Sequence, residues 1–211
     1  MKNGTVISLI RHGHVHNPDG LFYGRLPGFG LSAQGRSEAK RVGHALGGKP
    51  LTAIFCGPLL RARQTAQEIG LCHHELKIRV SRLLNEVNSA FEGCPMTTVR
   101  SQAGEVYASA ERQYDQPRDV FQRSRKFIAR ILTTYPGQHV AAITHGDVIV
   151  FTLLGFRELP LTPEAKTMLT RLGLPFTYPE TGSVTTLSFL TGSTEESPRA
   201  HYFKPEKQSR E

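Results

Sequence analysis

The chain lacks the residues that mark several specialised protein classes. It has no tryptophan and only three cysteines among its 211 residues, and Cys56, Cys72 and Cys94 lie far apart. This spacing excludes a disulfide-rich scaffold and a cysteine-based zinc finger, and it is typical of a reducing compartment. A chain of this length buries a full hydrophobic core without either kind of cross-link.

Long hydrophobic runs are missing as well. The apolar stretch near the N-terminus, Val6–Ile10, ends at Arg11 and is too short for the core of a signal peptide. The longest other run, Val148–Phe156, is far below the length of a membrane span. We therefore expect a soluble, cytoplasmic protein that has no membrane partner.

Acidic residues are in the minority, with 18 Asp and Glu against 26 Lys and Arg, for a formal net charge of +8. A basic balance suits nucleic acid, a membrane surface or a small anionic substrate. The basic residues are scattered, with no Lys/Arg block interleaved with aromatics, which disfavours nucleic acid. A small anionic ligand is the partner class that remains.

Short apolar runs alternate with helical patterns along the chain. Strands are expected at 5–10, 51–56, 77–80, 139–144 and 184–190, the last near an edge, with 201–203 as a further pairing segment. Helices are expected from the N-cap Ser32 to Gly47, at 59–69, within 97–113, and at 118–135, 148–154 and 163–171. Residues 13–31 and 82–95 are expected to form loops.

This alternation predicts an α/β fold: a three-layer sandwich with a mostly parallel central sheet and helices on both faces. We expect one domain over residues 1–204, with cap elements within 86–117 and 156–182, and a flexible tail at 205–211. Ligands of such sheets bind beyond the carboxyl ends of the strands, where the strand order switches.

Two apolar strands end in nearly the same way. The first runs into Arg11-His12-Gly13, and the later one runs into Thr144-His145-Gly146. If the strands are neighbours, both imidazoles face one crevice. The second histidine also precedes a helix, whose N-terminus favours an anion.

An arginine and a carboxyl group are expected at the same rim. Arg61 follows the second strand on the first turn of a helix, and guanidinium groups bind phosphoryl oxygens in a planar, bidentate manner. Glu86, which follows the short third strand, is the candidate proton donor, and Glu92 competes for this role. Repulsion from a bound phosphate raises the pKa of a carboxyl, although the arginines oppose that shift. A protonated Glu86 is a usable general acid.

Taken together, these motifs resemble the histidine phosphatase superfamily, the group that contains cofactor-dependent phosphoglycerate mutase and many phosphatases. The similarity covers nearly the whole chain and keeps the family's order. It is carried by Arg11-His12-Gly13, Tyr23-Gly24-Arg25, Leu31-Ser32 with Gly35, Leu59-Leu60-Arg61-Ala62 with Gln64-Thr65-Ala66, Glu86 with Phe91-Glu92-Gly93, His145-Gly146, and Gly182-Ser183-Val184-Thr185.

The resemblance implies a phosphoglycerate-mutase-like fold and a catalytic role for five residues. His12 is expected to accept the phosphoryl group, and Arg11, Arg61 and His145 to hold its oxygens. Glu86 is expected to protonate the leaving group and then to activate water. Contacts to the substrate are further expected from Asn17, Gly24, Arg25 and Gly146, with no cofactor and no metal.

The chain also departs from the family pattern near the first histidine. His14 stands where an acid is frequent, Val15 where threonine is usual, and Asn17 one residue nearer than in the mutases. These differences favour a metal-independent phosphomonoester hydrolase acting on a small phosphorylated metabolite over a mutase-type phosphotransferase.

Two readings outside this chemistry stay open. His12, His14 and His16 alternate as in a metal-binding run, which makes a metal hydrolase one alternative. A non-catalytic anion-binding module is the other. The physiological substrate is not encoded in any motif, and the oligomeric state is open, with a dimer among the options.

Overall fold

One six-stranded sheet organises the protein. The computed structural model describes residues 4–101, 106, 107, 109 and 111–206. The strands lie in the order β3-β2-β4-β1-β5-β6. Their bounds are β1 (Thr5–Arg11), β2 (Leu51–Cys56), β3 (Ile78–Val80), β4 (His139–Thr144), β5 (Val184–Phe189) and β6 (Arg199–Phe203). The pairs β1–β4, β2–β4 and β2–β3 are parallel, and β5 runs antiparallel to both of its neighbours. The predicted, mostly parallel sheet is confirmed.

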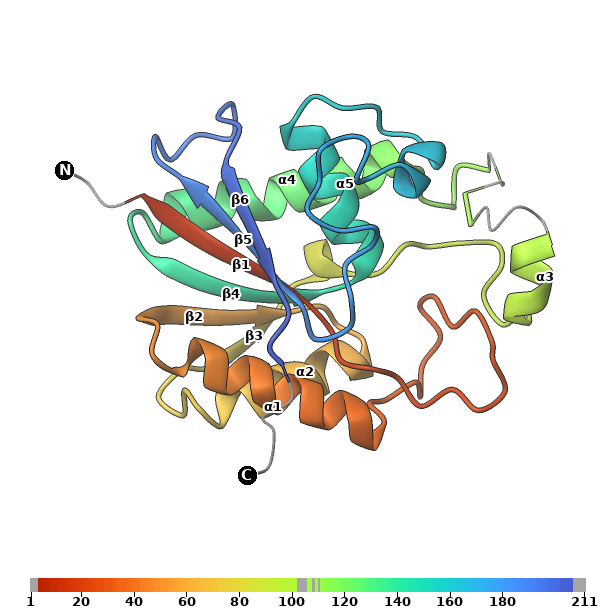
Figure 1. Ribbon diagram of the computed structural model, residues 1–211, viewed down its shortest axis with the longest axis horizontal. Coiled ribbons are helices and arrows are strands. Elements are labelled where there is room, and N and C mark those ends of the chain that lie inside the picture. Colours follow the sequence, from red (N-terminus) through yellow and green to blue (C-terminus); the bar gives the residue numbers. More distant parts are fainter. Residues whose placement is uncertain (1–3, 102–105, 108, 110, 207–211) are drawn as a thin grey trace.

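Helices cover both faces of this sheet (Figure 1). The helices α1 (Ala33–Gly47) and α2 (Leu60–Gly70) lie on one face, and α4 (Pro117–Thr134) and α5 (Gly146–Phe156) lie on the other. The helix α3 (Met96–Ser101) stands apart beyond the sheet, close to the loop 13–31. The buried apolar residues form two clusters, one on each face. This arrangement confirms the predicted three-layer sandwich.

The helix patterns follow from where each helix packs. The helix α4 buries one stripe, including Val120, Phe127 and Ile131, and exposes Arg118, Lys126 and Arg130, whereas Arg123 turns toward Asp115. In contrast, α5 is buried almost all round, because it packs between the sheet and α4. None of the helices among the described residues combines the length and the hydrophobicity that a membrane crossing needs.

Two local expectations need correction, and two are confirmed. The helix expected within 97–113 is present as α3, which ends at Ser101; residues 102–105, 108 and 110 lie outside the described part of the chain, and 111–116 lead into α4. The helix expected at 163–171 is a single 3₁₀ turn, η2 (Glu164–Thr167), and a second 3₁₀ turn, η1 (Arg82–Leu84), occupies part of the expected loop 82–95. The strand expected near an edge, β5, is the second strand from the edge, and the expected pairing segment forms the edge strand β6 (Arg199–Phe203). The predicted tail lies outside the described residues from 207 onward.

The start of α1 packs directly on the segment that follows β1. Ser32 caps this helix through a hydrogen bond from the Gly35 amide, as the sequence indicates. A Cβ atom on Gly35 would lie 2.0 Å from the carbonyl oxygen of His14, and one on Gly13 would lie 2.3 Å from the carbonyl oxygen of Gly35. Only glycine at both positions permits this approach. The contact fixes the backbone of Gly13 and His14, directly after His12.

We predict that Gly35→Ala destabilises the protein, because the added methyl group meets backbone that has no room to move. The free energy of unfolding, measured by urea denaturation, should fall by about 3 kcal/mol. Gly47→Ala in the same helix is the matched control: its Cβ would have nothing within 4 Å, and it should be neutral or stabilising by up to ~1 kcal/mol. Equal unfolding curves for the two variants would contradict the packing argument.

Candidate active site

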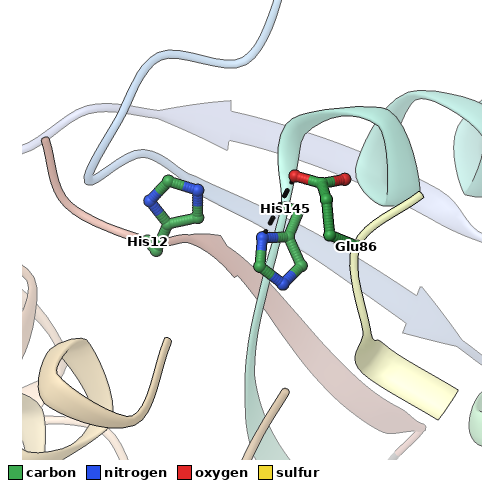
Figure 2. Close-up of side chains that lie close together, drawn as sticks. All are labelled: His12, Glu86 and His145. Carbon is green, nitrogen blue, oxygen red and sulfur yellow. Dashed lines mark ion pairs between the residues drawn. The ribbon is translucent and has the colours of Figure 1, made fainter. Parts of the chain in front are cut away.

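The imidazoles of His12 and His145 face each other at the carboxyl edge of the sheet. His12 follows β1 and His145 follows β4, and the two strands pair in parallel with Arg11 opposite Thr144. The ring centroids are 5.1 Å apart, and the ring planes meet at 62°. Figure 2 shows His12 on one side of the site and the paired side chains of Glu86 and His145 on the other. The structure thus brings the two histidines together from opposite halves of the chain.

The hydrogen bonds of His12 select one tautomer of its ring. Nδ1 lies 2.8 Å from the carbonyl oxygen of Gly13, and because a carbonyl oxygen only accepts, Nδ1 carries the proton. Nε2 lies 3.2 Å from Nε of Arg61, which only donates, so Nε2 is the acceptor. The lone pair of Nε2 therefore faces Arg61, on the side of the site where the guanidinium lies.

The surroundings of His12 also keep its ring neutral. Burial lowers the pKa of His12 well below the usual value, and the nearby charges of Arg61, His145 and Arg11 lower it further. The hydrogen bond to Gly13 acts in the opposite direction but does not offset these effects. A histidine with a lowered pKa is unprotonated at pH 7, and an unprotonated Nε2 is a nucleophile.

Arg61 is fully buried on the first turn of α2. Its Cζ lies 4.7 Å from the ring centroid of Tyr23, and Nη2 donates a hydrogen bond of 2.7 Å to the carbonyl oxygen of Gly24. Burial lowers the pKa of Arg61, whereas the neighbouring carboxylate of Glu86 raises it. The guanidinium remains a cation, because arginine does not lose its proton in proteins.

Arg11 is held in the same way from the other side of the site. Its Cζ lies 5.0 Å from the ring centroid of Tyr178, and Nη1 donates a hydrogen bond of 2.6 Å to the carbonyl oxygen of Pro179. Each guanidinium therefore lies over a tyrosine ring and donates a hydrogen bond to the carbonyl of the residue that follows this tyrosine. We call this pair of contacts a tyrosine–carbonyl clamp.

Glu86 lies between His145 and Arg61. Its Oε2 is 3.2 Å from Nδ1 of His145 and 3.6 Å from Nη2 of Arg61, while Oε1 accepts a hydrogen bond from the Val87 amide. Burial acts to raise the pKa of Glu86, but His145 and Arg61 outweigh it and hold this pKa below its usual range. The carboxyl of the free protein is therefore ionised, contrary to the expectation of a raised pKa. Burial lowers the pKa of His145, although Glu86 acts against this shift.

Buried nitrogens of the site lack a hydrogen-bond partner among the described residues. They are the donors Nε of Arg11 and Nη1 of Arg61, together with Nε2 of His145, whose Nδ1 lies against Glu86. A buried donor without a partner is costly, so such atoms point to a ligand that accepts hydrogen bonds. His145 is also the N-cap of α5, where the helix favours negative charge. The arrangement suits a tetrahedral oxyanion such as a phosphoryl group.

The same residues include a possible metal-ligand set. Among the described residues, His12, Glu86 and His145 bring ligand atoms within 4.8 Å of one another. Arg61 lies 3.2 Å from Nε2 of His12 and disfavours a cation there. The alternating histidines do not converge on this point, since His14 and His16 are exposed and Nδ1 of His14 is bonded to Ser32. The geometry favours an anion over a metal ion.

Other predicted residues serve the loops around the site. Both ends of the Asn17 amide bond the backbone of Leu21. Arg25 donates from Nε to the carbonyl oxygen of Glu86 and from Nη2 to Asp115, so it supports the loop that carries Glu86. Glu92 accepts from the Arg25 amide, whereas Glu86 is the carboxylate that contacts His145.

The two predicted glycines make room for the clamps. Gly24 supplies the carbonyl that holds Arg61, and its φ of 35° lies in the left-handed region. A Cβ atom on Gly146 would lie 2.3 Å from the hydroxyl of Tyr178. Both glycines therefore border the site through close backbone approach.

Reasoning from the sequence missed the residues that hold the arginines. Tyr23 was noted only within a motif, and Tyr178 not at all, because a lone tyrosine in an irregular segment carries no periodic signal. Thr65 was also missed as a support: its hydroxyl accepts from the Gly13 amide and donates to the Arg61 carbonyl, which ties the two catalytic segments together. Its place one helical turn after Arg61 was the available signal.

Comparison with known proteins agrees with this geometry. Residues 7–174 match the histidine phosphatase superfamily (branch 1), and the chain belongs to this family. An uncharacterised protein of Mycobacterium tuberculosis is 43% identical over 93 residues, which are 44% of this chain and 46% of that protein. The match therefore spans about half the length of this curated relative.

Solved structures share the fold at low sequence identity. The mycobacterial glucosyl-3-phosphoglycerate phosphatase superposes with a TM-score of 0.74 at 22% identity, covering 95% of this chain and 97% of that one. A structure described as mycobacterial hydrolase 2 gives 0.77 at 21%, with coverage of 98% and 93%. A phosphoserine phosphatase from Entamoeba histolytica gives 0.73 at 20%, with coverage of 97% and 98%. The α/β fold is thus that of the phosphoglycerate-mutase-like proteins.

We predict that the ring of Tyr178 matters for anion binding more than its hydroxyl does. Tyr178→Phe keeps the ring over Arg11 and should bind inorganic phosphate nearly as the parent does. Tyr178→Leu should weaken phosphate binding about twofold to thirtyfold, the range of a cation–π contact. Isothermal titration calorimetry measures both affinities. Equal losses in the two variants would show that the clamp does not orient Arg11.

Proposed function

We propose that this protein is a phosphomonoester hydrolase that works through a covalent phosphohistidine at His12 on a small phosphorylated metabolite. The tautomer of His12 is the observation that carries the proposal. Its Nε2 is an unprotonated nucleophile within a ring of fixed cationic donors. Phosphoryl transfer needs little else, because positioning and charge stabilisation dominate its catalysis.

In the first step, the lone pair of Nε2 attacks phosphorus and the bond from phosphorus to the ester oxygen breaks. Arg11, Arg61 and His145 hold the three remaining phosphoryl oxygens and stabilise their charge. The leaving oxygen takes a proton from Glu86. Because Glu86 is ionised in the free protein, this proton arrives with the monoanionic form of the ester and passes to the carboxylate when the ester binds.

In the second step, water attacks the phosphohistidine and the bond from phosphorus to Nε2 breaks. Glu86, again a carboxylate, accepts the proton of the attacking water. The electron pair of the broken bond returns to Nε2, and inorganic phosphate leaves. The positive charge that stabilises both steps comes from the protein's own side chains.

Mutase-type phosphotransfer is the second candidate, because it shares the first step. It differs only in returning the phosphoryl group to an organic acceptor. The names of two structural neighbours, a glucosyl-3-phosphoglycerate phosphatase and a phosphoserine phosphatase, support hydrolysis. Release of inorganic phosphate, with or without a bisphosphate primer, separates the two activities.

We predict that a labelled phosphomonoester leaves acid-labile, base-stable phosphate on the protein after rapid quenching. His12→Ala should abolish both the label and turnover, whereas His44→Ala, an exposed histidine of α1, should leave both unchanged. A chelator should have no effect, which separates this mechanism from a metal hydrolase. Full activity of His12→Ala would refute the covalent intermediate.

We further predict that Glu86→Gln slows esters according to their leaving group. Loss of proton donation should lower kcat by about 10²–10⁴-fold for alkyl phosphates, and much less for nitrophenyl phosphate, whose leaving group needs no proton. Glu92→Gln is the matched control, because its side chain can still accept from the Arg25 amide. Equal slowing of both ester classes by Glu86→Gln would remove Glu86 from the role of acid.

A further inference from the structure

A cavity of about 300 Å³ opens from the phosphoryl site toward α3. Arg11, Glu86 and Tyr178 border it on the side of the histidines. Because the phosphoryl group is held by the arginines and histidines, the rest of a bound ester extends into this cavity. Its lining therefore determines which alcohol the site accepts.

Apolar side chains line the cavity on the side away from the arginines. They come from the loop 13–31, the loop that carries Glu86, α3 and the segment that follows α3: Leu21, Phe22, Val87, Met96, Val99 and Val106. Val87 and Val99 are buried in the protein, while Met96 is half-buried. A wall of this kind favours the binding of an apolar group, because binding removes apolar surface of both partners from water.

The polar groups on the floor of the cavity are already paired. Asp147 accepts hydrogen bonds from the hydroxyls of Tyr107 and Tyr178, each at 2.6 Å, and from Nζ of Lys166 at 2.9 Å. Lys166 also lies 5.0 Å from the ring centroid of Tyr107. Its charge is neutralised by Asp147 and is not offered to a ligand.

Other nearby cations are likewise committed. Arg25 and Arg123 both bind the carboxylate of Asp115, at 2.7 Å and 2.9 Å. Among the described residues that line the cavity, Arg11 and Lys166 are the cations, and Arg11 belongs to the phosphoryl site. A carboxylate or a second phosphate on the substrate would be buried there against apolar groups, which is unfavourable.

We infer that the site selects phosphomonoesters of uncharged, apolar alcohols over esters that carry a second anionic group. This inference rests on the proposed function and narrows it to a substrate class. It also gives a reason to favour hydrolysis over phosphoglycerate mutase chemistry, because the substrates of that chemistry carry a carboxylate beside the phosphate.

A series of alkyl phosphates tests this preference directly. From ethyl to hexyl phosphate the value of kcat/KM should rise at least tenfold overall, since each buried methylene is worth up to about fourfold. The phosphate ester of 6-hydroxyhexanoate also releases a primary six-carbon alkoxide, but its chain ends in a carboxylate. Its kcat/KM should lie at least about tenfold below that of hexyl phosphate. A flat series, or faster turnover of the carboxylated ester, overturns the inference.

Met96→Lys places a cation in the apolar wall and should invert the preference. The ratio of kcat/KM for the carboxylated ester to that for hexyl phosphate should rise at least about tenfold, because the new charge pairs with the carboxylate. Met168→Lys is the matched control: Met168 is 37% exposed, lies outside the cavity lining, and should leave the ratio unchanged. Met96→Ser, which adds no charge, should reduce the gain along the alkyl series. Unchanged ratios in folded Met96 variants, judged by circular dichroism, count against the inference.

Binding of alkylphosphonates separates this inference from the proposed function. These compounds keep the phosphoryl-like anion but have no ester bond to break. Tighter binding of hexylphosphonate than of ethylphosphonate, measured by calorimetry, supports the apolar cavity even if no ester is turned over, in which case the hydrolase proposal alone fails. Equal affinities refute the cavity assignment, whatever the activity.

Discussion

The parallel pairing of β1 with β4 is the constraint on which the site depends. The two strands are adjacent and in register, so the residues that follow them leave the sheet at one edge. Both strands are buried over most of their length, and a shift of one residue would turn every side chain to the opposite face. The same packing that stabilises the core therefore places His12 against His145. The position of His12, the proposed nucleophile, is a consequence of the register of the sheet.

The site gathers positive charge in a buried place, and the structure balances this with few partners. Glu86 is the carboxylate in direct reach of Arg61 and His145. Burial of a charge costs several kcal/mol after relaxation, so further contacts are needed to stabilise the buried guanidinium groups. The two tyrosine–carbonyl clamps do this with a π face and a carbonyl dipole in place of a second negative charge. Because no further carboxylate of the described residues pairs with Arg11 or Arg61, N–H groups of both guanidiniums remain available to an anion.

The sequence predicts the parts of this structure that repeat a pattern. The apolar runs located the strands, and the strand ends located Arg11, His12 and His145, because a buried strand followed by a polar residue and glycine is visible in one dimension. Arg61 was visible for the same reason, at the first turn of a helix after a strand. Asn17 and Arg25 show the limit: the residue type announces a donor, but only the fold shows that these donors bond Leu21, Glu86 and Asp115.

The contacts that escaped prediction join segments far apart in the chain. Tyr178 reaches Arg11 across 167 positions, from an irregular stretch with no helical or strand period to reveal its direction. The lowered pKa of Glu86 escaped for another reason. The direction of this shift depends on distances of 3.2 Å to His145 and 3.6 Å to Arg61, whereas the sequence indicates only that a phosphate is near.

Asp147 connects the reacting end of the site with the end that selects the substrate. It lies two residues after His145 on the first turn of α5, and it holds Tyr178, whose ring supports Arg11. The same carboxylate neutralises Lys166 on the cavity floor. One buried carboxylate thus contacts both ends of the site: it accepts from the tyrosine whose ring lies under Arg11, and it pairs with the lysine that borders the apolar cavity. Asp147 therefore lies at the junction between the proposed phosphoryl site and the cavity.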